Sequence, residues 1–272
     1  MGWRDRGVEV KAPEQVASMR AAGLVVCRTL EVLRGAVRPG VTTRELNEIA
    51  DDAIRTAGAV PSFLGYQGYP ASICTSVNDE VVHGIPGDRE LREGDLLSID
   101  CGAIVDGWHG DAAVTVPVGE VGEDLLTLVA DTEAALWAGI AAARVGGRVG
   151  DISAAVEGRL REEGRYGIVE DYTGHGIGTA MHQPPDVPNV GRPGRGARLV
   201  PGLALAVEPM VTLGGHETEV LADEWTVVTA DGSWAAHVEH TFALTERGAW
   251  VLTAPDGGEE RLSALGMPYG GD

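Results

Sequence analysis

The sequence contains little cysteine, and its cysteines are not arranged in pairs. There are three, Cys27, Cys74 and Cys101, an odd number without CxxC spacing. This count excludes a disulfide framework and gives no support to a zinc site built from thiolates. We therefore expect free thiols that are buried or line a pocket, as in a protein of a reducing compartment.

The chain also lacks the apolar segments that direct proteins to membranes. Residues 1–11 contain no apolar signal-peptide region, and Arg6 stands where a myristoylation motif requires Ser or Thr. We find no later run of roughly 18 apolar residues, the length needed to span a bilayer. These absences predict a cytoplasmic protein without a membrane partner.

Positive charge is scarce as well. The chain has 21 Lys and Arg against 41 Asp and Glu, a formal net charge of -20. Binding to phosphate backbones requires clustered Lys and Arg, so we expect no specific nucleic-acid partner. The 272 residues, 44% of them hydrophobic, are enough to bury the core of one large domain or two small ones.

Helical periodicity is present in four segments. The spacing of apolar residues predicts helices over 13–37, 42–58, 124–143 and 150–163. Thr42 and Glu45 form a capping-box pattern at the start of the second. We predict an N-terminal extension over 1–12, a single catalytic domain over 13–254, and a glycine-rich, loosely structured tail over 255–272.

Two aspartates lie on either side of a turn-rich segment. Asp100 closes the apolar run 96–99, and Asp111 follows eleven residues later, after Asp106, Gly107 and Gly110. An apolar run, a turn and a returning run predict a β-hairpin. Because two carboxylates that converge in a core need a cation, this hairpin is a candidate metal site.

The second half of the chain repeats features of the first. A shift of 106 residues superimposes Gly40 on Gly146 and Gly58 on Gly164, and a shift of 108 superimposes Asp100 on Glu208. The segment around Asp111 has a looser counterpart around Glu239. The spacing therefore predicts an α/β domain of two pseudo-twofold-related halves, with its site at their junction.

Four acids at repeated positions suggest a centre for divalent cations. Any one of Asp100, Asp111, Glu208 and Glu239 is more typical of a solvated or salt-bridged strand end. Four together carry four charges, which two divalent ions would neutralise. Oxygen ligands with one imidazole, from His175, suit Mn, Fe, Co or catalytic Zn. A water bridging such ions becomes a nucleophile near neutral pH, which is hydrolase chemistry.

Other residues are candidates to line the same site. His83 and His182 lie in loop-like segments and could hold a substrate carbonyl or stabilise an oxyanion, although a lone histidine is more often a surface or core residue. The side chains of Tyr66, Tyr69, Cys74 and Trp225 could line an apolar pocket, although core packing is the commoner role of aromatic residues.

The motifs NDEVVHGIP, SIDCG, HGD, GHGIG, AVEP and VEHT occur in this order between residues 78 and 241. In this respect the chain resembles the type I methionine aminopeptidases of the pita-bread fold, from about Pro13 to Leu252. The resemblance implies a dimetal centre with the ligands Asp100, Asp111, His175, Glu208 and Glu239. Asp111 and Glu239 would bridge the two ions.

The resemblance also implies roles for the remaining candidates. His83 and His182 match the substrate-contacting histidines, and Glu208 matches the proton shuttle. The methionine pocket would comprise Tyr66, Tyr69, Cys74 and Trp225, with Phe63 and Met181 at its edges. Three positions depart from the family pattern: Met181 replaces a common Phe, AVEP replaces TIEP, and His237 stands where Gln is common.

The implied reaction is removal of the N-terminal methionine from polypeptides with a small second residue, by attack of a metal-bound hydroxide. The substrates would be nascent or newly made chains, with transient ribosome association, and the protein would be a monomer. Two alternatives stay open. One is a proline-specific peptidase of the same fold, an Xaa-Pro aminopeptidase or prolidase. The other is a non-catalytic pita-bread binding module.

Overall fold

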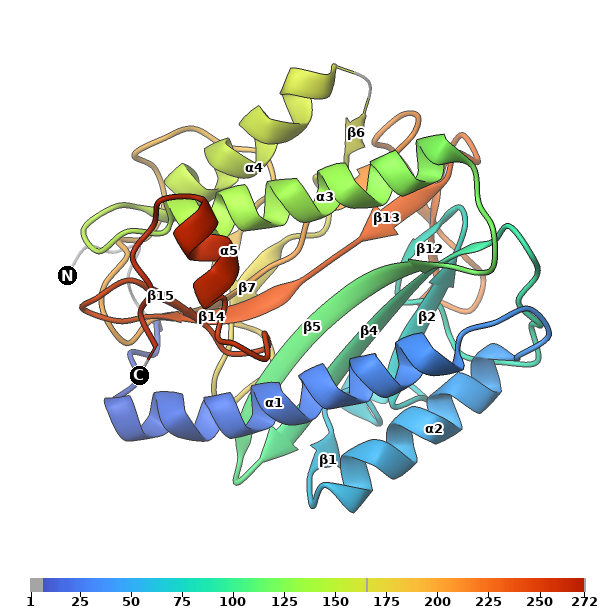
Figure 1. The fold of residues 1–272 in the computed structure, drawn as a ribbon, viewed down its shortest axis with the longest axis horizontal. Coiled ribbons are helices and arrows are strands. Elements are labelled where there is room, and N and C mark those ends of the chain that lie inside the picture. Colours follow the sequence, from blue (N-terminus) through green and yellow to red (C-terminus); the bar gives the residue numbers. More distant parts are fainter. Residues whose placement is uncertain (1–6, 165, 272) are drawn as a thin grey trace.

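The computed structural model describes residues 7–164 and 166–271, and its helices cover the outer faces of two groups of antiparallel strands (Figure 1). The helices are α1 (Pro13–Ala36), α2 (Thr43–Thr56), α3 (Glu123–Ala142), α4 (Val149–Glu163) and α5 (Glu259–Ala264), with a short 3-10 helix, η2 (Tyr66–Gly68). The four predicted helices are confirmed within two residues at each end. The capping box is also confirmed, since the Glu45 amide donates to Thr42 Oγ1 and the Thr42 amide donates to Glu45 Oε2.

A long hairpin is the centre of the first half. Strands β4 (Leu96–Val105) and β5 (Trp108–Pro117) pair along their whole length around a turn at Asp106 and Gly107, both with positive φ. The other edge of β4 pairs with β1 (Val60–Pro61) and β2 (Ile73–Val77). The predicted hairpin is confirmed, but Asp100 and Asp111 lie within the strands rather than at their ends.

The second half contributes a five-stranded sheet in the order β15-β14-β9-β7-β8 and a three-stranded sheet in the order β13-β10-β6. Another small sheet, β11-β12-β3, joins a strand of the first half to two of the second. The strands are β3 (Glu80–Val82), β6 (Gly167–Ile168), β7 (Gly174–Gly176), β8 (Gln183–Val187), β9 (Ala204–Val207), β10 (Met210–Thr212), β11 (Thr218–Val220), β12 (Val227–Thr229), β13 (Ala235–His237), β14 (His240–Leu244) and β15 (Ala249–Val251).

Helices α1 and α2 pack beside the β4–β5 hairpin, and α3 and α4 lie over the strands of the second half (Figure 1). The approach of α1 to β5 depends on glycine. A Cβ added at Gly110 would lie 2.7 Å from the amide nitrogen of Gly23, so the two backbones are in direct contact there. A larger residue at Gly110 would push the helix away from the strand that carries Asp111, whereas a Cβ at Gly23 would meet the carbonyl of Leu252.

Helix α3 is long and apolar enough, by length and composition, to cross a membrane, which the sequence analysis did not anticipate. Its residues Leu128, Ala135 and Ile140 are fully buried, in one cluster with residues of α4 and the neighbouring strands. Because this apolar face is packed inside the protein, α3 is accounted for as a core helix.

The C-terminal segment is more ordered than predicted. Asp256 accepts hydrogen bonds from the amides of Gly258 and Glu260, which fixes the start of α5, and Leu262 of that helix is fully buried with Ile140 of α3. The expectation of a loosely structured tail is therefore wrong here. The adjacent glycines Gly257 and Gly258 suggested a loop, but they form the turn that leads into the helix.

Candidate active site

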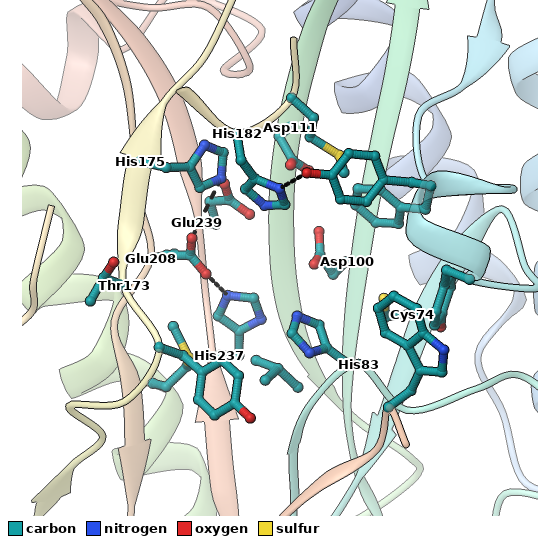
Figure 2. Close-up of a pocket in the computed structure, with 18 of the residues that line it drawn as sticks. Cys74, His83, Asp100, Asp111, Thr173, His175, His182, Glu208, His237 and Glu239 are labelled. Carbon is teal, nitrogen blue, oxygen red and sulfur yellow. Dashed lines mark hydrogen bonds and ion pairs between the residues drawn. The ribbon is translucent and has the colours of Figure 1, made fainter. Parts of the chain in front are cut away.

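A cavity of about 230 Å³ lies between the β4–β5 hairpin and the strands of the second half (Figure 2). Every site residue predicted from the sequence lines it. These residues are Phe63, Tyr66, Tyr69, Cys74, His83, Asp100, Asp111, His175, Met181, His182, Glu208, Trp225 and Glu239. The two halves of the chain therefore meet at one cavity, as the repeat predicted.

Six further residues line the cavity, and the sequence analysis assigned none of them a role there. They are Gln67, Val82, Tyr172, Thr173, Met210 and His237. Each lies within three residues of a predicted site residue in the chain, as Thr173 does beside the GHGIG motif and Met210 beside the AVEP motif. That adjacency was the available signal, but it does not say which neighbours face the cavity.

Backbone hydrogen bonds join the two halves beside the acids. The amide of Glu239 donates to the carbonyl of Ala113 over 2.9 Å, and Ala113 is directly opposite Asp100 in the hairpin. Thr241 Oγ1 donates to the carbonyl of Asp111 and accepts from its amide. Hydrogen bonds of the backbone and of the Thr241 hydroxyl thus join the segments of the two halves that carry these carboxylates.

Glu208 lies between two imidazoles. Its Oε1 is 3.6 Å from Nε2 of His175, and its Oε2 is 3.3 Å from Nε2 of His237 (Figure 2). Nδ1 of His175 donates to the carbonyl oxygen of Gly176 over 3.0 Å, which leaves Nε2 as the ring nitrogen that faces the cavity. An imidazole held in this way is suited to binding a metal through Nε2.

The pKa values of the four acids of the site are shifted in opposite directions, although burial alone would raise all of them. Burial raises the pKa of Asp100 to about 7. Burial, reinforced by the neighbouring carboxylates, raises the pKa of Asp111 and of Glu239 well above their usual range. Burial would also raise the pKa of Glu208, but the facing rings of His237 and His175 outweigh it and hold that pKa below its ordinary value.

The donors fit a divalent cation. Asp100 Oδ1, Asp111 Oδ1 and Glu239 Oε1 are buried oxygens without a hydrogen-bond partner among the described residues. The donor atoms form two groups, and the atoms within each group all lie within 4.8 Å of one another. One group contains Asp111, His175 and Glu239, and the other contains Glu208, His237 and Glu239. Buried carboxylates with raised pKa values are stabilised by a cation, and carboxylate with imidazole is a common ligand set for first-row metals.

Two histidines in loops, His83 and His182, line the cavity together with these acids. His182 Nδ1 is 2.8 Å from the hydroxyl of Tyr66, and its ring packs edge-on against His175 at 4.3 Å between centroids. Burial and the nearby His175 lower the pKa of His182 to about 4, so the ring is neutral at pH 7. When Tyr66 donates to Nδ1, the proton of His182 is on Nε2, which is then a hydrogen-bond donor.

His83 occupies an unusual backbone conformation. Its φ is 62°, a left-handed value that a histidine adopts only where the surrounding structure requires it. The next residue, Gly84, is in direct backbone contact with β2, because a Cβ there would lie 2.2 Å from the carbonyl oxygen of Thr75. Burial lowers the pKa of His83 as well, so this imidazole is also neutral at pH 7.

An apolar pocket adjoins the acids. Phe63, Tyr69, Cys74 and Met181 form a buried cluster with Trp225 packed against it. The Tyr69 hydroxyl lies within hydrogen-bond distance of two carbonyl oxygens, those of Ile73 and Gly84, to which it can donate. The Trp225 ring packs edge-on against the Tyr69 ring, with 5.0 Å between the centroids. Met181 is 3% exposed and helps to enclose the pocket.

Comparisons with known proteins agree with this site. Residues 17–246 match the model of metallopeptidase family M24. The chain is 52% identical to "Methionine aminopeptidase 1" of Mycobacterium tuberculosis over 91% of this chain and 96% of the relative. It is 49% identical to "Methionine aminopeptidase" of Clostridium acetobutylicum over 90% and 98%. The crystal structure of methionine aminopeptidase from Rickettsia prowazekii superimposes with a TM-score of 0.89 at 40% identity, covering 91% of this chain and all of that one.

The family match covers most of the chain, and these relatives are matched over nearly their whole length. The fold is accordingly the pita-bread fold that the sequence motifs implied. The chain belongs to metallopeptidase family M24, and within it to the type I methionine aminopeptidases.

Proposed function

We propose that this protein removes the N-terminal methionine from polypeptides whose second residue is small, using two divalent ions bound by Asp100, Asp111, His175, Glu208 and Glu239. The observation that carries the proposal is that an apolar pocket and a cluster of carboxylates share one cavity. A methionine side chain and the bond that follows it could then be held side by side. The methionine aminopeptidase relatives support the same assignment.

The number of ions follows from charge. The four carboxylates would carry four negative charges in a buried site, and two divalent cations balance them. The two donor groups that share Glu239 support this count. We propose Co, Mn, Fe or Zn, since carboxylate and imidazole ligands suit these metals. When bound, the ions supply a Lewis acid and a hydroxide nucleophile at neutral pH.

The chain's own residues orient the substrate. The methionine side chain enters the cluster of Phe63, Tyr69, Cys74 and Met181, and Trp225 closes one side. A substrate oriented in this way presents its first peptide carbonyl to His182 and His83. Their neutral rings can each donate one hydrogen bond to the carbonyl oxygen as negative charge develops on it.

Glu208 is placed to move the proton. Because its pKa is lowered, it is ionised at neutral pH and can accept a proton from the attacking water. The same carboxyl then donates that proton to the amine that leaves. His175 and His237 flank its two oxygens, so the carboxylate has little freedom to rotate away from the cavity.

The test is to strip the protein of metal, restore Mn, Co, Fe or Zn separately, and follow residue release by mass spectrometry. The substrates are Met-Ala-Ser, Leu-Ala-Ser and Ala-Pro-Ala. We expect metal-dependent release from Met-Ala-Ser alone. Cleavage of Ala-Pro-Ala instead would assign the protein to the proline-specific peptidases. No cleavage with any metal would contradict catalysis and favour a binding role.

Several expectations from the sequence are carried forward as parts of the same proposal. The protein would act in the cytoplasm as a monomer, on nascent or newly made chains, with transient ribosome association. The domain bounds of 1–12, 13–254 and 255–272 also stay predictions. Size-exclusion chromatography with light scattering would test the monomer, and co-sedimentation with ribosomes would test the association.

A further inference from the structure

His237 lies in the metal-binding cavity, although the ligand set proposed above does not include it. It is the last residue of β13 and is 2% exposed. Its Nε2 is 3.3 Å from Oε2 of Glu208, and Figure 2 shows the ring directed at that carboxylate. A ring nitrogen of His237 also lies within 4.8 Å of a donor oxygen of Glu239.

The Nε2 atom has no satisfied hydrogen bond. It is a buried polar atom without a hydrogen-bond partner among the described residues, although Oε2 of Glu208 lies 3.3 Å away. A buried imidazole nitrogen without a partner is costly unless something binds it. The neighbouring donor atoms are carboxylate oxygens, so a cation is the partner of matching chemistry.

The backbone of His237 is firmly held. Its amide donates to Thr115 Oγ1 over 3.0 Å, and its carbonyl accepts from the same hydroxyl over 2.7 Å. Ser98 Oγ lies 2.8 Å from Thr115 Oγ1 and completes this network. Thr115 and Ser98 are on the hairpin that carries Asp100 and Asp111, so the ring is positioned by the same element as the first two acids.

The spacing of the donors matches that around one ion. First-row metals bind His nitrogen and carboxylate oxygen at about 2.0–2.2 Å, so two donors at tetrahedral angles are about 3.3 Å apart. The His237 to Glu208 separation is 3.3 Å. We propose that His237 is itself a metal ligand, together with Glu208 and Glu239, so that the centre contains two imidazoles, one from His175 and one from His237.

This inference rests on the proposed function, since it concerns the same metal centre. It has a consequence for metal preference. Imidazole binds Co, Fe and Zn better than Mn, whose preferred ligands are carboxylate, carbonyl and water. A second imidazole therefore raises the affinity for Co, Fe and Zn relative to the affinity for Mn. In a variant with an amide at position 237, the affinities for these metals and for Mn should differ less.

The number of ligating rings can be counted directly. We would load the metal-stripped protein with Co²⁺ and record proton NMR spectra with ¹⁵N-labelled histidine, because imidazoles bonded to Co²⁺ have the most strongly shifted ring signals. Two such rings are expected. A single ligating ring would overturn the inference while leaving the proposed function intact. Failure of the protein to bind Co²⁺ at all would overturn both.

The matched variant is His237→Gln, whose amide can accept or donate a hydrogen bond but is a poor ligand for these metals. We expect it to lose one of the two shifted rings and to bind Co²⁺ and Zn²⁺ about 10-fold or more weakly, with a smaller change for Mn²⁺. His216→Gln is the control, since the side chain of His216 is 52% exposed and lies outside the cavity lining. Equal losses of affinity for all three metals, with both shifted rings retained, would show that His237 only positions Glu208. If His237→Gln failed to fold, the ring count in the unaltered protein would still decide.

Discussion

The side chains of Asp100 and Asp111 are diagonal neighbours on one face of the β4–β5 hairpin. Asp100 lies opposite Ala113, and Asp111 is two residues before Ala113 on the same strand, so both side chains point to the same side. The buried Asp100 carboxylate disfavours ionisation of Asp111, which adds to the effect of burial in raising the pKa of Asp111. A divalent cation bound between them, as proposed, would remove this repulsion and would link metal binding to the stability of the fold.

The pH dependence of the metal-stripped protein should reveal this linkage. Burial raises the pKa of Asp100 to about 7, so the folded protein binds more protons than the unfolded chain above about pH 4. Protonated Asp100 therefore contributes its full share to the free energy of unfolding below about pH 4. This contribution, up to about 4 kcal/mol, is lost as the pH rises to about 7.

Urea unfolding of the metal-stripped protein between pH 4 and 7.5 would measure this loss, with Asp100→Asn as the reference. The free energy of unfolding of the unaltered protein should fall relative to that of the variant across this range, and added Co²⁺ should abolish the fall. Parallel pH profiles for the two proteins would contradict the prediction.

Asp111→Asn tests the metal centre without changing side-chain size. Replacing this buried acid would remove a proposed metal ligand. Because metal chemistry supplies several kcal/mol of transition-state stabilisation, release of methionine should fall by about a thousandfold or more. Calorimetric titration with Co²⁺ should show weaker binding. Asp106→Asn, at the exposed turn of the same hairpin, is the matched control and should keep full activity. Equal activities of the two variants would remove Asp111 from the metal site.

The sequence predicted the helices and the acids of the site for identifiable reasons. Apolar periodicity and caps are local signals, so α1 to α4 could be placed from neighbouring residues alone. The acids were found because a shift of 108 residues superimposes Asp100 on Glu208, and because the segments around Asp111 and Glu239 resemble each other more loosely. A repeat in the sequence thus indicated convergence in space, which a single acid would not have done.

The remaining features depend on long-range pairing. His237 faces the cavity because β13 pairs with β10, where Met210 is its direct partner, and because its backbone bonds to Thr115. Nothing local in the sequence around Ala235 predicts that register. Helix α5 was missed because its stability comes from the burial of Leu262 against distant parts of the chain, and its own six residues carry too little periodicity.

Tyr66→Phe tests the role of the hydrogen bond to His182. Without the hydroxyl at 2.8 Å, Nδ1 of His182 loses its partner, and the ring is less firmly held with its Nε2 proton toward the substrate. Since a net hydrogen bond contributes about 1 kcal/mol, we expect kcat for Met-Ala-Ser to fall about fivefold with little change in KM. Tyr269→Phe, in the C-terminal segment outside the cavity lining, is the control. A rise in KM alone would indicate that Tyr66 acts only as part of the pocket wall.

Trp225→Ala tests whether the aromatic wall selects methionine. The Trp225 ring packs edge-on against Tyr69 and faces the cavity, so its removal leaves the substrate side chain in contact with water on one side. Differences of this kind in an apolar pocket amount to about 1–3 kcal/mol, so kcat/KM for Met-Ala-Ser should fall by roughly 10- to 200-fold. In the wider pocket, the ratio of kcat/KM for Met-Ala-Ser to that for Phe-Ala-Ser should also decrease. Competition between the two substrates in one reaction, followed by mass spectrometry, would measure this ratio.

Leu221→Ala is the control, because Leu221 is 44% exposed and does not line the cavity. An unchanged preference in Trp225→Ala, with activity equal to that of Leu221→Ala, would mean that selectivity depends on the buried cluster of Phe63, Tyr69, Cys74 and Met181 alone.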